Sequence, residues 1–421
     1  MKILHVVQGY TPTIGGTEHL VQRVSEELVT QFNDQVTVFT TNCYSAEAFS
    51  TPSLPRMNTG WEEINGVRLH RFPVAARLSQ PFGYLSRDLR LPGSQYFRTL
   101  YNGPIVPGLS RAIQQADFDI AVAASFPLLH MFTTLHAAHR THRPCVLIGC
   151  LHTDDAWGFD RPSIYRLIQQ AEGYISLTTH EADYVISRNV TPEKVTAIGA
   201  GTDLSQFEGI EKNDARRHLD IPVDVPLVGF IGQVTWRKGV ETLVRAMQSV
   251  WQIFPSAHLL IAGAKTLYAD QLASVLEKLP LQDRQKIILR YNFPDEDKPR
   301  MFAALDILAY PSWYESFGIA YIEAWAVEKP VIGCKIGAVP YVIDAGRDGL
   351  LINFDDSDAL AEAILILLQN PAWAHQMGAQ GRLKVLSRYN WPEIARRYRQ
   401  VYLRALEGYR STHLSTHNKD R

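Results

Sequence analysis

Short apolar runs rich in β-branched residues alternate along the chain with longer stretches in which apolar residues recur every three or four positions. The first pattern is typical of buried strands, and the second of amphipathic helices. In the first half of the chain, one helical stripe consists of Leu20, Val21, Val24 and Leu28. The strands expected in this half are 3–7, 36–40, 120–123, 146–148 and 174–177. This alternation predicts an α/β fold in which helices cover both faces of a parallel sheet.

The pattern restarts after Asp203, and the polar segment 207–225 is expected to be a linker or a domain entry. The strands expected beyond it are 227–231, 259–261, 287–289, 307–309 and 331–332. We therefore predict two doubly wound, Rossmann-like domains, 1–205 and 206–390, facing a central cleft. In such domains a ligand is expected beside the carboxyl ends of the strands. A single larger α/β domain is the alternative.

Composition and charge narrow the class of protein. A length of 421 residues suits two or three domains, and 46% apolar with 20% charged residues is typical of a soluble globular chain. The formal net charge of −1 argues against a protein held to nucleic acid by bulk charge. No apolar run approaches the 18 or so residues of a membrane span, and the first residues do not resemble a signal peptide.

Four cysteines in so long a chain form neither a disulfide framework nor a zinc cluster. They are Cys43, Cys145, Cys150 and Cys334. We therefore expect a cytoplasmic protein. No protein partner can be inferred from the sequence.

Residues 311–330, PSWYESFGIAYIEAWAVEKP, hold the most informative chemistry. Two carboxylates, Glu315 and Glu323, flank the expected start of a helix near Gly318. The backbone N–H groups of Ser316, Phe317 and Gly318 would lie at that helix start, where partial positive charge favours a phosphate. Either glutamate alone could be an ordinary solvated charge.

Two glycine-containing loops follow expected strands. After 227–231 comes GQVTWRKG, in which Arg237 and Lys238 suit a diphosphate, although such a pair is often a solvated surface pair. After the first strand comes GYTPTIGGTE, which lacks the dinucleotide fingerprint. Its Gly15 and Gly16 could bring N–H groups against a phosphate or sugar, or could form a plain flexible turn.

His152, in the sequence CLHTDDAW after the strand 146–148, could contact a sugar hydroxyl or a developing charge. A structural histidine is the alternative. Together with His152, Asp154 and Asp155 could instead bind a metal ion. We rank this alternative below a metal-free site, because Arg237 and Lys238 already offer positive charge to a phosphate.

The segment 77–98 interleaves aromatic residues with basic ones. Its members are Arg77, Phe82, Tyr84, Arg87, Asp88, Arg90, Tyr96, Phe97 and Arg98, with a net charge of 4 − 1 = +3. Such a segment could bind an anionic carrier or touch the inner face of an anionic membrane. A basic loop that covers the fold is the alternative.

With these segments in view, the chain resembles the retaining nucleotide-sugar glycosyltransferases of family 4, which have the GT-B fold of two Rossmann-like domains. The segments that carry the resemblance are the Gly15-Gly16 loop, His152, IGAGTDLSQF, the RKG loop, Glu315 to Glu323, and GAVPYVIDAGRDGLLI at 337–352. The resemblance implies a hexosyltransferase that needs no metal or cofactor, as in polysaccharide or glycolipid biosynthesis. The donor would be a UDP- or GDP-sugar, and the acceptor a hydroxyl of a glycan, lipid carrier or small molecule.

The resemblance also implies roles for residues of the donor domain, 206–390. Arg237 and Lys238 would bind the diphosphate, and the backbone of 316–318 would meet the distal phosphate and the sugar. Glu315 would hold hydroxyls of the transferred sugar, and Glu323 would hold the ribose.

In the acceptor domain, 1–205, the resemblance implies that Gly16 approaches the phosphate and that His152 lies by the reacting sugar. It further implies a final helix, at about 391–410, that packs back on this domain. The chain departs from the family pattern at Ala200 to Asp203, at Glu328-Lys329, where glycine is common, and at Tyr341, where an acidic residue is common. Two other functions can share the architecture: a nucleotide-sugar 2-epimerase and a non-catalytic nucleotide-sugar-binding subunit.

Overall fold

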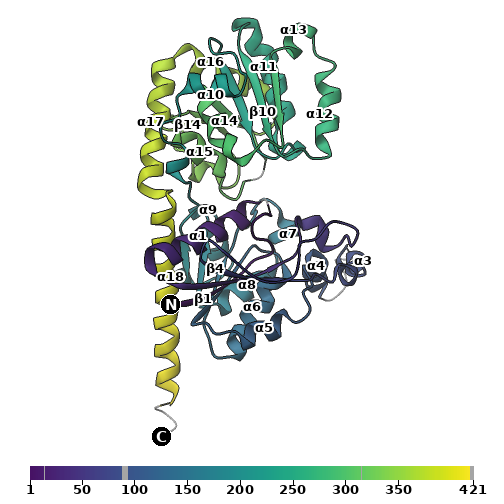
Figure 1. The fold of residues 1–421 in the computed structure, drawn as a ribbon, viewed down its shortest axis with the longest axis vertical. Coiled ribbons are helices and arrows are strands. Elements are labelled where there is room, and N and C mark those ends of the chain that lie inside the picture. The colour runs from purple at the N-terminus through teal and green to yellow at the C-terminus, as the bar shows by residue number, and fades with distance from the viewer. Residues whose placement is uncertain (14, 88–92, 314, 418–421) are drawn as a thin grey trace. The chain divides into compact units, whose positions relative to one another are not determined.

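The computed structural model describes residues 1–13, 15–87, 93–313 and 315–417. The chain divides into two compact units, residues 1–200 with 391–421 and residues 201–390 (Figure 1). The first division lies five residues before the boundary expected from the sequence. Each unit is an α/β domain built on a mainly parallel sheet.

The first unit contains an eight-stranded sheet in the described part of the chain, with the order β3-β4-β2-β1-β5-β6-β7-β8. The strands in that order are Gly60–Ile64, Val67–Phe72, Gln35–Thr41, Lys2–Val6, Ile120–Ala124, Cys145–Ile148, Gly173–Ser176 and Val195–Ala197. All neighbouring strands are parallel except β3 and β4, which form an antiparallel hairpin. The strand order reverses between β1 and β5, as in doubly wound sheets.

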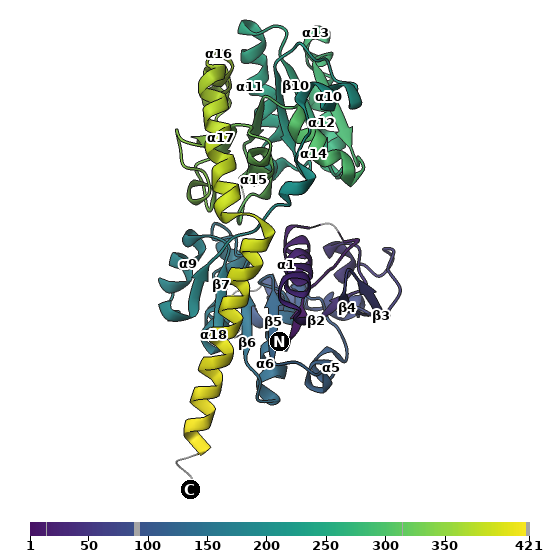
Figure 2. The same ribbon diagram turned by 60° about the vertical axis from the view of Figure 1, so that its left-hand side comes forward.

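Helices cover the first sheet on both faces. Side chains alternate between the two faces of β1: His5 contacts Ser25 of α1 and Tyr402 of α18, whereas Leu4 packs in the core with Met131 of α6. The long helix α18 lies along α1 and contacts β6 and β7 (Figure 2). The helices of this unit are α1 Gly16–Phe32, α2 Ala76–Ser79, α3 Phe82–Arg87, α4 Ser94–Asn102, α5 Leu109–Gln115, α6 Leu129–Arg140, α7 Ala156–Phe159, α8 Pro162–Gln170, α9 Thr179–Ile186 and α18 Trp391–His417.

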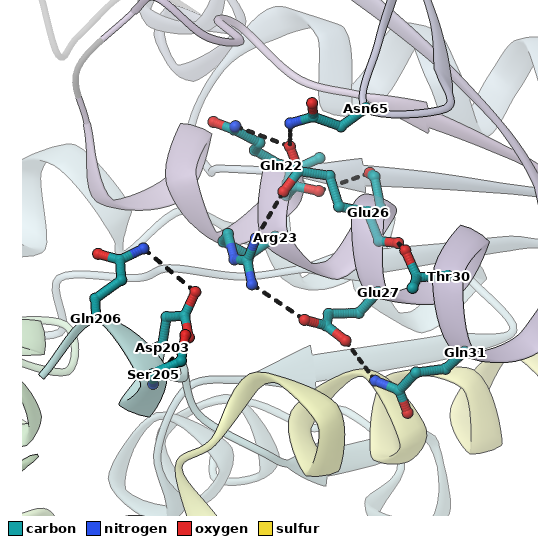
Figure 3. A network of polar contacts seen from close by, with 12 residues as sticks. Gln22, Arg23, Glu26, Glu27, Thr30, Gln31, Asn65, Asp203, Ser205 and Gln206 are labelled. Atoms are coloured by element: carbon teal, nitrogen blue, oxygen red, sulfur yellow. Dashed lines mark hydrogen bonds and ion pairs between the residues drawn. The ribbon is translucent and has the colours of Figure 1, made fainter. Parts of the chain in front are cut away.

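The outer side of α1 carries a polar network (Figure 3). Arg23 donates to Glu26 over 2.9 Å and to Glu27 over 3.1 Å, and the amide of Asn65 donates to Glu26 over 2.8 Å. Figure 3 also shows Asp203 of the second unit, which accepts a hydrogen bond from Ser205. Pairs of this kind on a helix surface contribute a few tenths of a kcal/mol each, roughly 0.2–0.5.

The second unit has a six-stranded parallel sheet with the order β11-β10-β9-β12-β13-β14. The strands in that order are Ile287–Tyr291, His258–Gly263, Leu227–Ile231, Ile307–Tyr310, Val331–Cys334 and Gly349–Ile352. The helices are α10 Lys212–His218, α11 Val240–Ile253, α12 Tyr268–Leu276, α13 Leu281–Arg284, α14 Lys298–Ala304, α15 Ile319–Ala326, α16 Ser357–Gln369 and α17 Pro371–Arg388. The strand order reverses between β9 and β12.

Of the two interpretations of 207–225, the domain entry is confirmed and the linker is wrong, because this segment lies near the start of the second unit, which begins at Gly201. It forms α10, whose Arg216 is only 1% exposed. The Arg216 guanidinium donates to the carbonyl of Ala304 over 2.8 Å and pairs with Asp306 over 2.8 Å. One arginine of a mostly exposed helix can therefore be buried when its charge finds partners inside the domain.

Four strands were missed by the apolar pattern: β3, β4, β8 and β14. The hairpin of β3 and β4 had a usable signal, because Asn65 and Gly66 between the strands both adopt positive φ. Asn-Gly is the preferred pair for a two-residue hairpin turn of this type. In the described part of the chain, we find no helix with the length and apolarity needed to cross a membrane.

Candidate active site

The two loops singled out in the second unit follow neighbouring strands. The loop 232–239 follows β9, and the loop 311–318 follows β12, which pairs with β9. The strand order reverses between these two strands, which is where doubly wound sheets leave a crevice for a ligand. The structure therefore brings the two predicted segments of this unit to one edge of one sheet.

Glycine shapes the first loop. Residues 236–238 form a short 3-10 turn that ends at Gly239, where φ is +70°. A Cβ atom at Gly239 would lie 2.1 Å from the carbonyl oxygen of Pro311, so a larger residue would push the two loops apart. Earlier in the loop, a Cβ at Gly232 would lie 2.5 Å from the hydroxyl of Tyr310. These two positions keep the backbone close to the end of β12.

The second loop leads directly into α15. Gly318 precedes the helix with φ at +93°, and the ring of Tyr321 fills the space where its Cβ would lie. No side chain caps this helix start. The first amide groups of α15 therefore provide its positive end, which suits an anion. Phe317 is 2% exposed and packs edge-on against Tyr389, so its side chain belongs to the core and its backbone is what it can offer a ligand.

Backbone and side-chain contacts join the two loops. The N–H of Trp313 donates to the carbonyl of Arg237 over 2.7 Å. The ammonium of Lys238 pairs with the carboxylate of Glu315 at 2.5 Å. Burial is the largest single influence and opposes the charged form of Lys238, but the charges and hydrogen bonds of Glu315 and Tyr310 together outweigh it and raise the pKa of the ammonium above its usual value. Two residues chosen as candidates from separate motifs are thus in direct contact.

Tyr310, the last residue of β12, was missed by the sequence analysis. Burial raises its pKa to about 12, Lys238 opposes this, and Glu315 and Glu323 add to it. The ammonium of Lys238 also lies 5.4 Å from the centre of its ring. Lys238, Glu315 and Glu323 therefore all act on one buried phenol. The only signal in the sequence was a tyrosine directly before Pro311 at a strand end.

Glu323 is 7% exposed on α15 and pairs with the ammonium of Lys298, the first residue of α14. Lys298 lies 25 residues before Glu323, and nothing in its acidic surroundings, DEDKPR, singled it out. Ser316 is half-buried beside Glu315, and Arg237 is exposed with its guanidinium 5.4 Å from the ring centre of Trp236. The second-unit candidates thus share one region, but each glutamate has its own lysine.

Gly15, Gly16 and His152 belong to the first unit. Gly15 precedes α1, and a Cβ there would lie 2.2 Å from a carboxylate oxygen of Glu18. Glu18 accepts a hydrogen bond from the side chain of Gln8 over 2.9 Å, and burial raises its pKa. Sequence analysis missed Glu18, whose position in the first turn of α1 was the available signal. A side chain at Gly15 would therefore displace the end of the Glu18 side chain, whereas the extended backbone at this position, with φ at −178°, suits any residue.

His152 follows β6 and lies edge-on to Phe159, with ring centres 5.3 Å apart. Its carbonyl accepts from the N–H of Asp155, and the Asp155 carboxylate accepts from the N–H of Gly158 over 2.9 Å. Asp155 is thus occupied in starting α7. Among the described residues, no group of three or more His, Cys, Asp or Glu side chains could hold a metal ion.

Two family models match consecutive parts of the chain. The model described as "Glycosyl transferase 4-like domain" matches residues 15–201, and "Glycosyl transferases group 1" matches residues 211–384. This chain belongs to the GT-B glycosyltransferases of the family-4 type. The two matches correspond closely to the two units of the structure.

Curated relatives of this glycosyltransferase include an "Alpha-maltose-1-phosphate synthase" of Mycolicibacterium smegmatis, 26% identical over 56% of this chain and 64% of the relative. A "D-inositol 3-phosphate glycosyltransferase" of Corynebacterium diphtheriae is 27% identical over 66% of this chain and 65% of the relative. The chain therefore matches less than two thirds of the length of either. Among solved structures, Anabaena HepE in complex with UDP-glucose has a TM-score of 0.71 at 17% identity, covering 96% of this chain and 99% of that one. The last likeness confirms the fold of two Rossmann-like domains.

The basic segment 77–98 of the glycosyltransferase is only partly a surface. Arg77 is exposed, and Tyr96 is 49% exposed. Phe82 and Phe97 stack on each other with ring centres 6.2 Å apart. Asp88 and Arg90 lie outside the described residues, as do the side chains of Tyr84 and Arg87. Arg98 is 7% exposed and does not contribute to a charged surface, because its guanidinium donates to carbonyl groups inside the unit.

Proposed function

We propose that this glycosyltransferase moves a hexosyl unit from a UDP- or GDP-sugar to a hydroxyl acceptor, with retention at the anomeric carbon and without a metal ion. The observation that carries this proposal is the Lys238–Glu315 pair, which joins the loops after β9 and β12 at the reversal of strand order. The relatives' names support sugar transfer, and a neighbour with the same fold was solved with UDP-glucose.

The chemistry at this pair follows from charge. In the free protein, the ammonium of Lys238 and the carboxylate of Glu315 neutralise each other. A sugar pyrophosphate would give the ammonium a phosphate oxygen to bind and would give the carboxylate sugar hydroxyls to accept from. The ammonium, Arg237 and the first amides of α15 would then face the oxygen on which negative charge grows, where fixed donors are most effective.

In the transfer step, the bond from C1 to the phosphate oxygen breaks while a bond from C1 to the acceptor oxygen forms on the same face. The proton of the acceptor hydroxyl passes to the departing phosphate. No carboxylate nucleophile is needed, and Glu323 is reserved for the ribose. Gly16 and His152 keep the roles implied by the family resemblance, at the phosphate and by the reacting sugar.

The test measures nucleotide release from a panel of UDP- and GDP-sugars with and without candidate acceptors, followed by NMR of the product anomer. Acceptor-dependent release with retained configuration supports the proposal. Conversion of the sugar without release would instead establish an epimerase, and binding without either reaction would establish a binding subunit.

A variant separates the two glutamates. Glu315→Gln should abolish sugar-dependent turnover while leaving nucleotide affinity within about threefold, because Glu315 is assigned to the sugar alone. Loss of nucleotide affinity in this variant would show that the roles of Glu315 and Glu323 are exchanged.

A further inference from the structure

Two arginines are buried in the first unit, near the loop that carries His152. Arg98 lies on α4 and is 7% exposed, and Arg161 immediately precedes α8 and is 1% exposed. The short helix α7 lies between His152 and Arg161 in the chain and is labelled close to α4 in Figure 1. Fully buried arginines normally have a carboxylate or a full set of hydrogen bonds.

Arg161 has neither. Its Nη1 reaches the hydroxyl of Thr99 over a long 3.4 Å, and its Nε and Nη2 have no hydrogen-bond partner. The buried hydroxyl of Ser163, two residues further on, forms no hydrogen bond either. Nε and Nη2 donate from the same edge of the guanidinium, which is the edge that binds two oxygens of one anion side by side.

Arg98 adds a second positive charge. Its Nε donates to the carbonyl of Ser86 over 3.3 Å, its Nη1 donates to the carbonyl of Trp157 over 3.0 Å, and its guanidinium lies 4.8 Å from the ring centre of Trp157. Within the part of the chain that the structure describes, neither arginine forms an ion pair. Burial and then the charge of Arg98 lower the pKa of Arg161 to about 10, and Asp155 opposes this only in part.

The amino end of α8 adds partial positive charge next to Arg161. Arg161 is the N-cap residue of α8, a nine-residue helix with no acidic residue in its first turn. The amino end of a helix carries partial positive charge, so a buried cation there is unfavourable and an anion is favourable. Two guanidiniums and a helix start thus lie together, and the charge of Asp155 offsets the buried charge of Arg161 only in part.

We propose that Arg98, Arg161 and the hydroxyl of Ser163 form a binding site for a phosphate monoester group of the acceptor. Naming the acceptor rests on the proposed transfer reaction, whereas the binding of a phosphate does not. The free edge of Arg161 takes two phosphate oxygens, and Ser163 donates to a third. Arg161 is 1% exposed, whereas Trp157 of α7, whose carbonyl accepts from Arg98, is half-exposed.

The first test measures the thermal midpoint of the full chain against inorganic phosphate at constant ionic strength, with chloride as the balancing anion. A Lys238→Ala background removes a phosphate contact of the proposed donor site. We expect the midpoint to rise with phosphate, and the rise to disappear when Arg161→Gln is added. Arg166→Gln is the matched control, because Arg166 is exposed on the same helix. No rise with phosphate, or a rise that survives Arg161→Gln, overturns the proposal.

A second measurement distinguishes phosphate binding by Arg161 from a purely structural role of this residue. In the absence of phosphate, Arg161→Met removes an uncompensated buried charge and should leave the thermal midpoint unchanged or higher. A midpoint clearly below that of Arg166→Gln would show that Arg161 holds the fold and would overturn the proposal. Ser163→Ala should weaken phosphate binding by less than Arg161→Gln does, since it removes one neutral donor.

The source of the monoester is decided with two probes, glycerol 3-phosphate in solution and vesicles of phosphatidic acid in phosphatidylcholine. Arg161-dependent binding of glycerol 3-phosphate indicates a soluble acceptor. Arg161-dependent binding of the vesicles alone indicates a lipid acceptor. Binding of inorganic phosphate with neither probe overturns the assignment to a monoester. If a phosphate site is confirmed but no sugar is transferred, the proposed function fails while the site stands.

Discussion

Buried charges are handled in opposite ways in two regions of the molecule. Around β9 and β12 of the second unit, Lys238 pairs with Glu315 and Lys298 pairs with Glu323. Near the His152 loop of the first unit, Arg161 has no ion-pair partner among the described residues. Buried charge is costly without a partner. The comparison indicates that the region around β9 and β12 carries its own counter-charges before a donor arrives, whereas the region around Arg161 leaves a place for a negative group.

The largest effect is expected at Lys238, in the ion pair with Glu315. Lys238→Ala should lower kcat by about 10²–10³, the usual loss when one donor is removed from a charge-stabilising site. Lys278→Ala, an exposed lysine of the same unit, is the control and should keep normal turnover. Steady-state kinetics of both variants would decide, and near-normal kcat in Lys238→Ala would remove the leaving-group role.

The next effect concerns Glu181, a buried carboxylate of the first unit held by neutral groups. It accepts from the hydroxyl of Tyr174 over 2.5 Å and from the N–H of Leu177 over 3.0 Å. Burial raises its pKa to about 7, and these hydrogen bonds oppose the rise. The folded state therefore holds this proton in a window where the unfolded chain, with an ordinary pKa near 4.5, has lost it.

Stability from this group should be fully present below pH 4.5 and lost as the pH rises through 7. The loss amounts to about 3 kcal/mol, at roughly 1.4 kcal/mol per pKa unit. Urea unfolding at several pH values should show this decline in the wild type and not in Glu181→Gln. Glu63→Gln, an exposed carboxylate on β3, serves as control and should follow the wild type. Parallel pH profiles for all three proteins would contradict a protonated Glu181.

A smaller effect is expected for the ion pair between Lys298 and Glu323. A double-mutant cycle of Lys298→Ala and Glu323→Gln should give a coupling free energy of about 1 kcal/mol, because Glu323 is nearly buried. The exposed pair Arg217–Asp214, with both side chains about two-thirds exposed, should give less than about 0.5 kcal/mol. Equal couplings would mean that the crevice pair is no better than a surface contact.

The smallest expected effect concerns the backbone conformation at Glu328 in the second unit, rather than a charged pair. Glu328, one of the departures from the family pattern, has φ at +57°, a conformation in which glycine is unstrained. Glu328→Gly should raise the free energy of unfolding by less than about 1 kcal/mol. Its contacts to Arg382 and His375 are long, 3.7 Å each, so their loss should matter little. Glu328→Ala lacks the glycine freedom, and an equal gain in both variants would refute this explanation.

The sequence predicted the parts of the site that depend on local order. A strand followed by a glycine-containing loop and a helix sets the position of Lys238 and Glu315, because parallel strands end at the same edge of a sheet. Partners that come from distant positions could not be read in this way. Lys298 reaches Glu323 through the packing of α14, and Arg161 lies in the sequence FDRPS, which looks like an exposed turn. Burial of a charged side chain is decided by tertiary packing, which no periodicity encodes.

The second unit is a single uninterrupted stretch whose two ends meet. Near its start, the N–H of Thr202 donates to the carbonyl of Tyr389 over 2.8 Å, and Asn390 forms a bridge with the same residue. In topological terms, 201–390 is an insertion into the first unit. An insertion whose termini adjoin can be excised and produced by itself, and its host can be closed with a short linker. Nucleotide and phosphate binding could then be assigned to separate polypeptides.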